Sequence, residues 1–252
     1  MSQVRRHELI VDFVNRHGFA NIEQLTSHFM VTPQTIRRDL NQLASLGQVR
    51  RHHGGASSSS STKNSDYSDR LSFNMGAKIR IAEKVASCIP NGASLFINIG
   101  TTNEAIARAL LHHEELQVVT NNLHVASILL PKEDFNVIIA GGQVRSRDGG
   151  IVGEQTSDFI NQFKMDFGII GISAIHEDGS LLDYDYREVR VAQSIIKNSS
   201  KLILSADHSK FDRTALARLG HISQADYLYT DQTPGQHTLD ILTAHNVNLH
   251  IA

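Results

Sequence analysis

Two groups of polar residues have the types and the spacing to do chemistry, and the first lies among the N-terminal sixty residues. The segment PQTIRRDLNQLASLG, read as a helix at about 100° per residue, separates an apolar face from a face of hydrogen-bond donors. Arg, Gln, Asn and Thr side chains near the start of a helix can contact base edges and phosphates in the major groove of DNA. Asp39 is the one acidic residue expected on this surface. We therefore predict DNA contacts from Thr32, Gln34, Thr35, Arg37, Arg38 and Asn41.

A basic hairpin is predicted to follow this helix. Gln48 to His53 can form a strand, and Gly54-Gly55 permits a tight turn. Such a wing would place basic side chains beside the phosphates or the minor groove, which adds three predicted DNA contacts, Arg50, Arg51 and His53. The two adjacent histidines suggest metal binding as an alternative. Neighbouring side chains of a strand point to opposite faces and chelate poorly, so we predict no metal site.

The second group lies where predicted strands of the larger C-terminal part end. Gly, Thr, Asn and Ser follow apolar β-type segments there, and Arg145 and Lys210 come shortly after two of them. In an open α/β sheet the ligand binds outside the carboxyl ends of the strands, where glycine permits close backbone approach and helix N-termini favour anions. The hydroxyls of Thr101, Thr102 and Ser173 with these two cations therefore predict a phosphate site. The sequence has neither GxxxxGK[ST] nor GxGxxG, so no motif supports a nucleotide, and we predict no cofactor.

Two sets of elements are needed to position these residues. Near the N-terminus, Val4 to His17 has an apolar helical stripe, Asn21 with Gln24 can start a second helix, and Thr32-Pro33 can start the third. Further along, apolar β-type segments alternate with helical patterns, which predicts an α/β fold with a mostly parallel sheet covered by helices. The predicted strands of that sheet are 93–100, 117–120, 136–140, 167–172, 201–206, 227–230 and 248–251.

A serine-rich segment separates the two parts. Ser57 to Ser61 is unbroken serine, and Thr, Lys, Asn and Ser follow. Such a composition cannot bury a core and is typical of a flexible linker. We therefore predict an N-terminal DNA-binding domain at 1–56, a linker at 57–66 and a larger ligand-binding and oligomerisation domain at 67–252.

The combined motifs resemble those of a known family. PQTIRRDL, followed by a short spacer and HHGGA, is similar to the winged helix-turn-helix signature of the DeoR family of bacterial transcriptional regulators. The resemblance places the helix-turn-helix itself at about residues 20–39. It covers nearly the whole chain apart from the serine linker, because SRDGGIVGE at 146–154, DYDYREVR at 183–190 and DHSKF at 207–211 also resemble members of the family.

The resemblance implies a sensor role for the larger domain. Residues 75–252 look like the effector-binding domain of these regulators, whose fold is similar to that of ribose-5-phosphate isomerases. Asn98 departs from the family pattern, in which Asp is common, so no carboxylate role carries over to that position. Where the residues match, the resemblance implies effector contacts from Gly100, Thr101, Thr102, Asn121, Arg145, Gly171 and Lys210.

Charge and composition narrow the class of protein. The 252 residues are 40% hydrophobic and 20% charged, as in soluble globular proteins. The net charge of −2 conceals a partition, because residues 1–60 carry seven Lys and Arg against four Asp and Glu, whereas the remainder has an acidic excess. No apolar segment approaches the roughly 18 to 20 residues of a membrane span, and no signal core is present, so we expect a cytoplasmic protein without a membrane partner. Cys88, the single cysteine, cannot form an intrachain disulfide.

These patterns favour a regulator rather than an enzyme. We expect a repressor that binds operator DNA as a dimer or tetramer and is released by a small phosphorylated effector. On resemblance alone the effector is glycerol-3-phosphate and the target a glycerol catabolic regulon, with another sugar phosphate as the alternative. A sugar-phosphate isomerase fused to a DNA-binding module stays open, with Asp183, Asp185 or Glu188 as the general base. We favour instead a solvated acidic loop that leads into a helix capped by Asp185, and we predict no catalytic residue.

Overall fold

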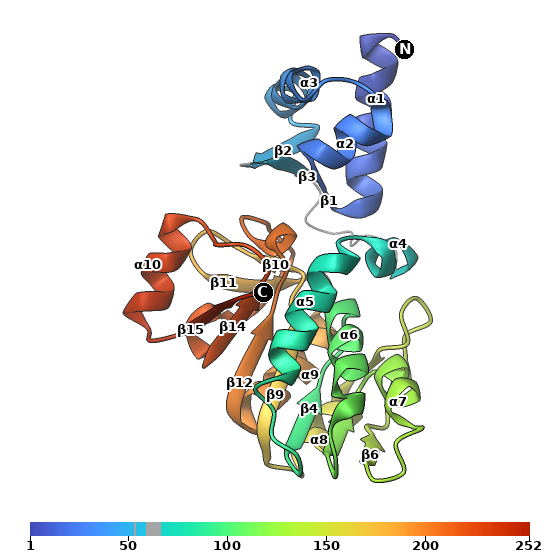
Figure 1. Cartoon of the computed structure of the whole chain (residues 1–252), viewed down its shortest axis with the longest axis vertical. Coiled ribbons are helices and arrows are strands. Elements are labelled where there is room, and N and C mark those ends of the chain that lie inside the picture. Colours follow the sequence, from blue (N-terminus) through green and yellow to red (C-terminus); the bar gives the residue numbers. More distant parts are fainter. Residues whose placement is uncertain (53, 59–66) are drawn as a thin grey trace. The chain divides into compact units, whose positions relative to one another are not determined.

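The computed structural model describes residues 1–52, 54–58 and 67–252, which divide into two compact units, Met1–Phe73 and Asn74–Ala252 (Figure 1). His53, a predicted DNA contact, lies outside the described residues, as do residues 59–66 of the predicted linker. Ser57 and Ser58, where that linker was expected to begin, belong to a strand, and the helix α4 (Tyr67–Ser72) is part of the first unit. Among the described residues, no helix is long and apolar enough to cross a membrane.

The first unit packs three helices on a small antiparallel sheet. The helices are α1 (Gln3–His17), α2 (Ile22–Phe29) and α3 (Pro33–Ser45). The sheet has the order β1 (Phe19–Asn21), β3 (Gly55–Ser58), β2 (Val49–His52). Both predicted helix starts are confirmed. Asn21 and Gln24 form a reciprocal capping box at 2.7 and 2.9 Å, and the Thr32 hydroxyl accepts the N–H of Thr35 at 3.2 Å.

The apolar faces of these elements form one core, and a glycine lets the sheet close against it. Its fully buried residues include Ile10, Val14, Leu25, Ile36, Leu40 and Leu43. Gly55 lies in β3 rather than in the turn predicted at Gly54-Gly55. A Cβ at position 55 would lie 2.3 Å from the carbonyl oxygen of Ala20, so the close approach of β3 to β1 requires glycine.

The second unit is built on a seven-stranded sheet in which every pairing is parallel. The predicted α/β fold with a mostly parallel sheet is therefore confirmed. In spatial order the strands are β15 (Asn248–Ile251), β14 (Tyr227–Thr230), β12 (Ser199–Ser205), β9 (Met165–Gly171), β4 (Ser94–Ile97), β5 (Gln117–Thr120) and β6 (Asn136–Ile139).

Helices cover both faces of this sheet (Figure 1). One face packs against α5 (Met75–Ala86), α6 (Thr101–Ala109) and α7 (Leu123–Leu129). The other packs against α8 (Glu154–Ile160), α9 (Tyr186–Lys197) and α10 (Gln236–Ala244). Successive residues of β4 serve opposite cores, since Phe96 packs on the second face and Ile97 on the first. Burial on both sides explains why the strands are continuous apolar segments in the sequence.

The direction of the strand order reverses between β4 and β9. From β4 the chain moves outward through β5 and β6, and from β9 it moves the other way through β12, β14 and β15. Ligands of open α/β sheets bind at such a reversal, outside the carboxyl ends of the strands. The remaining described elements are β7 (Gln143–Val144), β8 (Ile151–Val152), β10 (Ala174–Ile175), β11 (Ser180–Asp183), β13 (Ala217–His221) and the short 3₁₀ helices η1 (Leu110–His112), η2 (His208–Lys210) and η3 (Ile222–Gln224).

Candidate functional site

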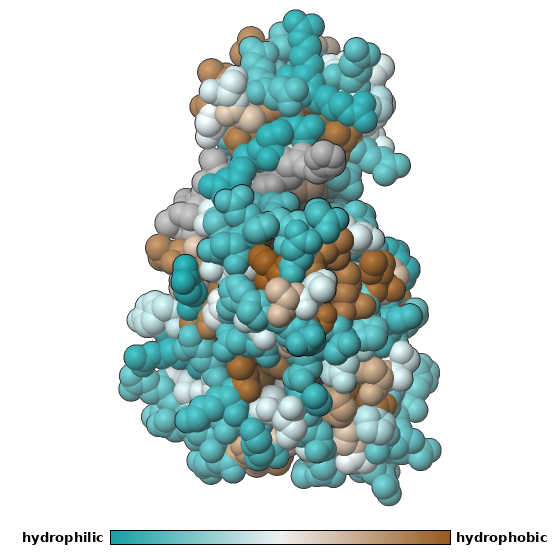
Figure 2. All heavy atoms as spheres, turned by 90° about the vertical axis from the view of Figure 1, so that its left-hand side faces the viewer, coloured by the Kyte–Doolittle hydropathy of each residue, from teal (hydrophilic) through white to brown (hydrophobic). Residues whose placement is uncertain are grey.

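The DNA contacts predicted from the third helix share one surface of the first unit. The face of this unit that carries α3 and β2 is mainly hydrophilic (Figure 2). Thr35 is half-buried, and its hydroxyl lies 2.9 Å from that of Thr32 at the start of the helix. The four exposed residues of α3 that were predicted as contacts are Gln34, Arg37, Arg38 and Asn41. Such a row of donors on the first two-thirds of a helix suits the major groove.

Asp39 was expected on this surface, and that expectation is wrong. The side chain is 1% exposed and faces α1, where Arg6 donates to it at 2.6 and 3.2 Å and His7 Nε2 lies 3.0 Å away. Burial alone would raise the pKa of Asp39, but the hydrogen bonds from Arg6 and His7 outweigh it and hold this pKa below its usual value. The acidic residue of α3 therefore ties α3 to α1 and leaves the exposed face without a carboxylate of its own.

The two described arginines of the predicted wing differ in their contacts. Arg50 is exposed on β2. Arg51 donates from Nε to the Asn41 side-chain oxygen at 3.1 Å and from Nη1 to the carbonyl oxygen of Gly55. Burial and the nearby charge of Arg37 lower the pKa of Arg51. Arg51 thus holds the hairpin β2–β3 against α3, so helix and wing form one basic surface.

In the second unit, the turn from β4 into α6 lies at the reversal of strand order. Gly100 adopts a φ of 138°, a conformation that L side chains rarely take, and its carbonyl oxygen accepts the N–H of Glu104 at 3.0 Å. Thr101 and Thr102 form the first turn of α6. The backbone N–H groups at such a helix start carry partial positive charge and suit an anionic ligand.

A buried network of amides and hydroxyls joins this turn to neighbouring strands. Asn103 Nδ2 donates to the carbonyl oxygens of Asn98 and Ile99 at 2.9 and 3.3 Å. Its Oδ1 accepts the hydroxyl of Ser205, at the end of β12, at 2.9 Å. The Asn98 side chain is itself buried and accepts the N–H of Ile99 at 2.8 Å. The carboxyl ends of β4 and β12 are therefore hydrogen-bonded through α6.

Asn121 follows β5 at the same edge and has one unused acceptor. Its Nδ2 donates to the carbonyl oxygen of Ile151 at 3.0 Å, whereas its buried Oδ1 has no hydrogen-bond partner among the described residues. An unsatisfied buried acceptor costs stability unless a ligand or water completes it. Gly171 ends β9, and the atoms nearest to a Cβ there would belong to Asn103 and the Ile99 carbonyl, at 3.6 Å or more.

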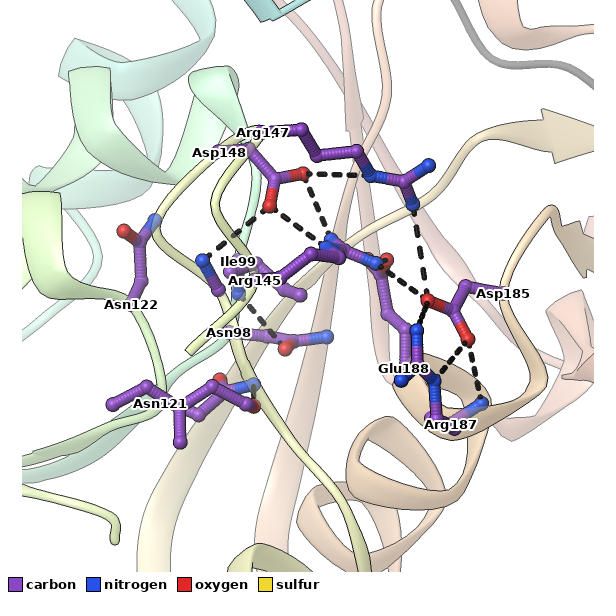
Figure 3. Close-up of polar contacts among 12 residues, drawn as sticks. Asn98, Ile99, Asn121, Asn122, Arg145, Arg147, Asp148, Asp185, Arg187 and Glu188 are labelled. Carbon is purple, nitrogen blue, oxygen red and sulfur yellow. Dashed lines mark hydrogen bonds and ion pairs between the residues drawn. The ribbon is translucent and has the colours of Figure 1, made fainter. Parts of the chain in front are cut away.

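Arg145 was predicted to contribute positive charge to a phosphate site, and the structure places it within a cluster of carboxyl groups (Figure 3). Its Nε and Nη2 donate to the two oxygens of Asp148 at 2.8 Å each. Its Nη1 lies 3.2 Å from Asp185 and 2.8 Å from Glu188. Arg147 reaches Asp148 and Asp185 only at 3.8 and 3.9 Å. The guanidinium is thus neutralised within the protein, and a phosphate would have to compete with three carboxylates.

The same cluster corrects the expectation of a solvated acidic loop. Asp185 does cap α9, because it accepts the N–H of Arg187 at 3.0 Å. Asp183 is buried, and Glu188 retains 15% exposure of its side chain. Burial and the charge of Asp183 raise the pKa of Glu188 to about 8, and burial likewise raises that of Asp183. The spacing in DYDYREVR signalled acidic residues near one another, but nothing in it indicated their burial or their shared arginine.

Lys210 belongs to a loop after β12 that is organised by a buried carboxylate. Asp207 is 1% exposed, and its Oδ1 accepts the N–H of Ser209 and the Nδ2 of Asn74, each at 3.0 Å. Burial opposes ionisation, but the charges of Lys210 and Lys78 and these hydrogen bonds lower the pKa of Asp207 to about 2. In the same loop, His208 Nδ1 lies 2.7 Å from Asp231.

The structure brings most of the predicted effector residues to one edge of the sheet. The loop after Arg145 packs over this edge, because a Cβ on Gly150 would lie 2.9 Å from Ile99 and 3.3 Å from Arg145. Residues that the sequence analysis did not assign to the site are Asn103 in the first turn of α6, Ser205 at the end of β12, and Asp148 and Asp207 in loops. The predicted residues at the ends of β4, β5 and β9 are Gly100, Thr101, Thr102, Asn121 and Gly171.

Known proteins resemble the chain over its whole length. It is 53% identical over 251 residues to the glycerol-3-phosphate regulon repressor of Escherichia coli, with 100% of both chains covered. It is 56% identical over 234 residues to the protein of the same name from Haemophilus influenzae, covering 93% of this chain and 91% of that one. The HTH-type transcriptional repressor CsqR of Escherichia coli is 38% identical, with 91% and 88% covered. These relatives are named as repressors and not as enzymes.

Solved structures resemble the chain more distantly. Ribose 5-phosphate isomerase A from Methanocaldococcus jannaschii has 12% identity and a TM-score of 0.41 over 55% of each chain, a likeness that does not bear on function. Family models are more specific. That of the DeoR C terminal sensor domain matches residues 73–232, and that of the DeoR-like helix-turn-helix domain matches residues 6–62. The chain therefore belongs to the DeoR family of transcriptional regulators.

Proposed function

We propose that this chain is a transcriptional repressor of a glycerol catabolic regulon, released from its operator by glycerol-3-phosphate. The observation that carries the proposal is the 53% identity, over 100% of both chains, to a protein named glycerol-3-phosphate regulon repressor. The alternative is a repressor of the same family that responds to another sugar phosphate. We place its action in the cytoplasm, on operator DNA.

The operator is bound by the basic surface of the first unit. Proposed contacts on α3 are the four exposed residues, with Thr32 and Thr35 at its start, and Arg50 on the wing. Arg51 contributes charge while it fixes the hairpin, and His53 remains a predicted contact outside the described residues. A single winged unit has a small DNA interface, so we propose that a dimer or tetramer occupies repeated half-sites.

The effector is bound at the carboxyl edge of the parallel sheet. Its phosphate is held by the N–H groups and hydroxyls of Thr101 and Thr102, with Gly100 allowing close approach. The free Oδ1 of Asn121 can accept a hydroxyl of the polyol, and Gly171 leaves room beside Asn103. Lys210 supplies positive charge from the next loop. Arg145, neutralised by three carboxylates, shapes the edge and serves as a weaker phosphate partner than a free guanidinium.

Release follows from differential binding. The effector must bind the conformation with low operator affinity more tightly than the one with high affinity, and by linkage the operator then weakens effector binding by the same factor. No catalytic role is needed for Glu188, whose raised pKa follows from its burial beside Asp183. A preparation that interconverts sugar phosphates would instead support the isomerase alternative.

The test is a gel-shift titration against a duplex that the parent protein selects from a random library. We expect glycerol-3-phosphate to weaken binding of the parent. Arg38→Ala should weaken operator binding by about 1–3 kcal/mol, roughly 5- to 150-fold, because it removes a base or phosphate contact. Arg16→Ala removes the same charge from an exposed position on α1 and is the matched control.

The second arm of the same titration uses Lys210→Ala, which should need more glycerol-3-phosphate than the parent for release. Equal operator affinity of the Arg38 and Arg16 variants would remove α3 from the interface. A parent that ignores glycerol-3-phosphate but responds to another sugar phosphate would change the effector and leave the repressor proposal intact.

A further inference from the structure

The boundary between the two units falls on the peptide that joins Phe73 to Asn74. Phe73 is held in the first unit, where its N–H donates to the Asp69 carbonyl oxygen at 2.9 Å and its ring lies 6.0 Å from that of His17. Asn74 belongs to the second unit and opens α5. The conformation of Asn74 therefore sets the direction in which the chain leaves the second unit.

Asn74 has an uncommon conformation for a residue that precedes a helix. Ncap residues are usually extended and accept a hydrogen bond from the first turn. Asn74 instead has φ 53° and ψ 32°, in the left-handed region, and makes no side-chain cap bond to α5. Its Nδ2 donates to Asp207 Oδ1 at 3.0 Å, across 133 residues of sequence. The contact with Asp207 thus takes the place of the usual cap.

Asp207 stands between α5 and the loop that carries Lys210. On the α5 side it meets Asn74 and the charge of the buried Lys78. On the loop side, Ser209 donates to its Oδ1 and the charge of Lys210 acts on it. Its second oxygen, Oδ2, is buried without a hydrogen-bond partner among the described residues. A carboxylate with a free oxygen and two groups of partners can redistribute its interactions between them.

The loop is also connected to the proposed effector edge. Ser205, two residues before Asp207, donates to Asn103 at 2.9 Å, and Asn103 holds the carbonyl oxygens of the β4–α6 turn. A ligand at that turn therefore adjoins Asn103 and its hydrogen bond to Ser205, and the backbone continues from Ser205 to Asp207, which accepts from Asn74.

We propose that Asn74 is the positioning residue through which effector binding reaches the DNA-binding unit. This inference rests on the proposed function. An anion that engages Lys210 competes with Asp207 for the same ammonium group, so Asp207 shifts its hydrogen bonding toward Asn74 and Lys78 on α5. The shift changes the backbone of residue 74, and with it the direction of the chain toward Phe73.

The test measures operator affinity with and without glycerol-3-phosphate for the full chain. Asn74→Gly removes the side-chain hydrogen bond but accepts the left-handed conformation without strain, so folding is preserved. We expect the ratio of the two operator dissociation constants to shrink at least fivefold. By linkage, the ratio of effector affinities measured with and without operator must shrink by the same factor. A merely structural role of Asn74 would instead weaken operator binding without effector and leave the ratio of the two operator dissociation constants unchanged. Asn246→Gly, at another left-handed asparagine of the second unit with φ 56°, should leave the ratio unchanged.

A ratio for Asn74→Gly within twofold of the parent's would overturn the proposal. A second arm works without effector. Asp207→Asn should change operator affinity in the parent, and have no effect in the Asn74→Gly background, because its influence passes through Asn74. An equal effect of Asp207→Asn on operator affinity in the parent and in the Asn74→Gly background would overturn the proposed role of Asn74. If glycerol-3-phosphate fails to release the parent protein from the operator, the proposed effector is wrong. The double-mutant cycle of Asn74→Gly and Asp207→Asn needs no effector and still tests the role of Asn74.

Discussion

The two units treat buried charge in opposite ways. In the first, one carboxylate, Asp39, has two basic partners, Arg6 and His7, within 3.2 Å. In the second, one guanidinium, Arg145, has three carboxylates within the same distance. The pKa of Asp39 is held below its usual value, whereas that of Glu188 rises to about 8. At Glu188, burial and the charge of Asp183 outweigh Arg145, whereas at Asp39 the hydrogen bonds from Arg6 and His7 outweigh burial, so the balance between burial and ionic partners decides the direction.

The difference fits what each unit is proposed to bind. Asp39 pairs with basic side chains of α1 rather than with the exposed donors of α3. Those donors therefore have no carboxylate of α3 competing for them. Glu188, in the cluster around Arg145, also lies beside the charge of buried Asp183, and burial together with that charge favours its protonated form. A surplus of base lies on the surface of the first unit, and a surplus of acid is buried in the second. The net charge of the chain reveals neither arrangement.

The largest effect is expected when the better-compensated carboxylate is removed. Asp39→Ala leaves Arg6 and His7 without their buried partner and should destabilise the first unit by about 3–5 kcal/mol. Hydrogen exchange followed by mass spectrometry resolves this unit, through peptides of α1 and α3. Asp12→Ala breaks an exposed ion pair with Arg16 and should cost no more than about 1 kcal/mol. Equal losses in both variants would show that burial of Asp39 adds nothing.

Local chemistry made much of the fold predictable. Asn21 with Gln24 and Thr32 with Pro33 marked helix starts because capping involves residues three apart. Alternation of apolar strands and helical stripes indicated a parallel sheet. The place of β4 beside β9 was not predictable, because strand order depends on packing among segments far apart in the sequence. Gly55 was assigned to the turn because the approach of Ala20 to it is a tertiary contact.

In the candidate site, too, local features were predictable from the sequence and tertiary contacts were not. Gly, Thr and Asn at strand ends could be found from sequence, since each adjoins an apolar segment. Ion partners could not, because Arg6 and Asp39 are 33 residues apart and Arg145 and Asp185 are 40 apart. A pattern of Asp and Arg residues shows that charges are present, but only the fold shows which of them neutralise one another.

The next effect distinguishes the two units by the pH dependence of their stability. Glu188 has a folded pKa of about 8 against 4.5 for an ordinary glutamate, so the folded unit holds a proton that the unfolded chain releases. Stability of the second unit should therefore fall as pH rises from about 4.5 to 8, by at most about 1.4 kcal/mol per pH unit from this group. Asp39, with a lowered pKa, has the opposite sign and loses its contribution as pH falls.

Glu188→Gln carries no titrating group and should flatten the fall between pH 5 and pH 8, measured by hydrogen exchange of peptides from β4 and β9. Glu154→Gln changes an exposed glutamate of α8, paired with Arg190 on the surface, and should keep the slope of the parent. A parent whose second unit is equally stable at both pH values would show that Glu188 is ionised throughout and that the cluster around Arg145 holds no extra proton.

The smallest effect tests whether an ion pair in the cluster around Arg145 must be buried to stabilise the second unit. Arg187 contacts the same Asp185 as Arg145, at 3.1 and 3.2 Å, but its side chain is 40% exposed where that of Arg145 is 9% exposed. Water and salt screen an exposed pair, so Arg187→Ala should change the stability of the second unit by less than about 1 kcal/mol. Hydrogen exchange at low and high salt measures this. A larger loss of stability that does not depend on salt would contradict this prediction. It would show that Arg187 interacts with Asp185 as strongly as the buried Arg145 does.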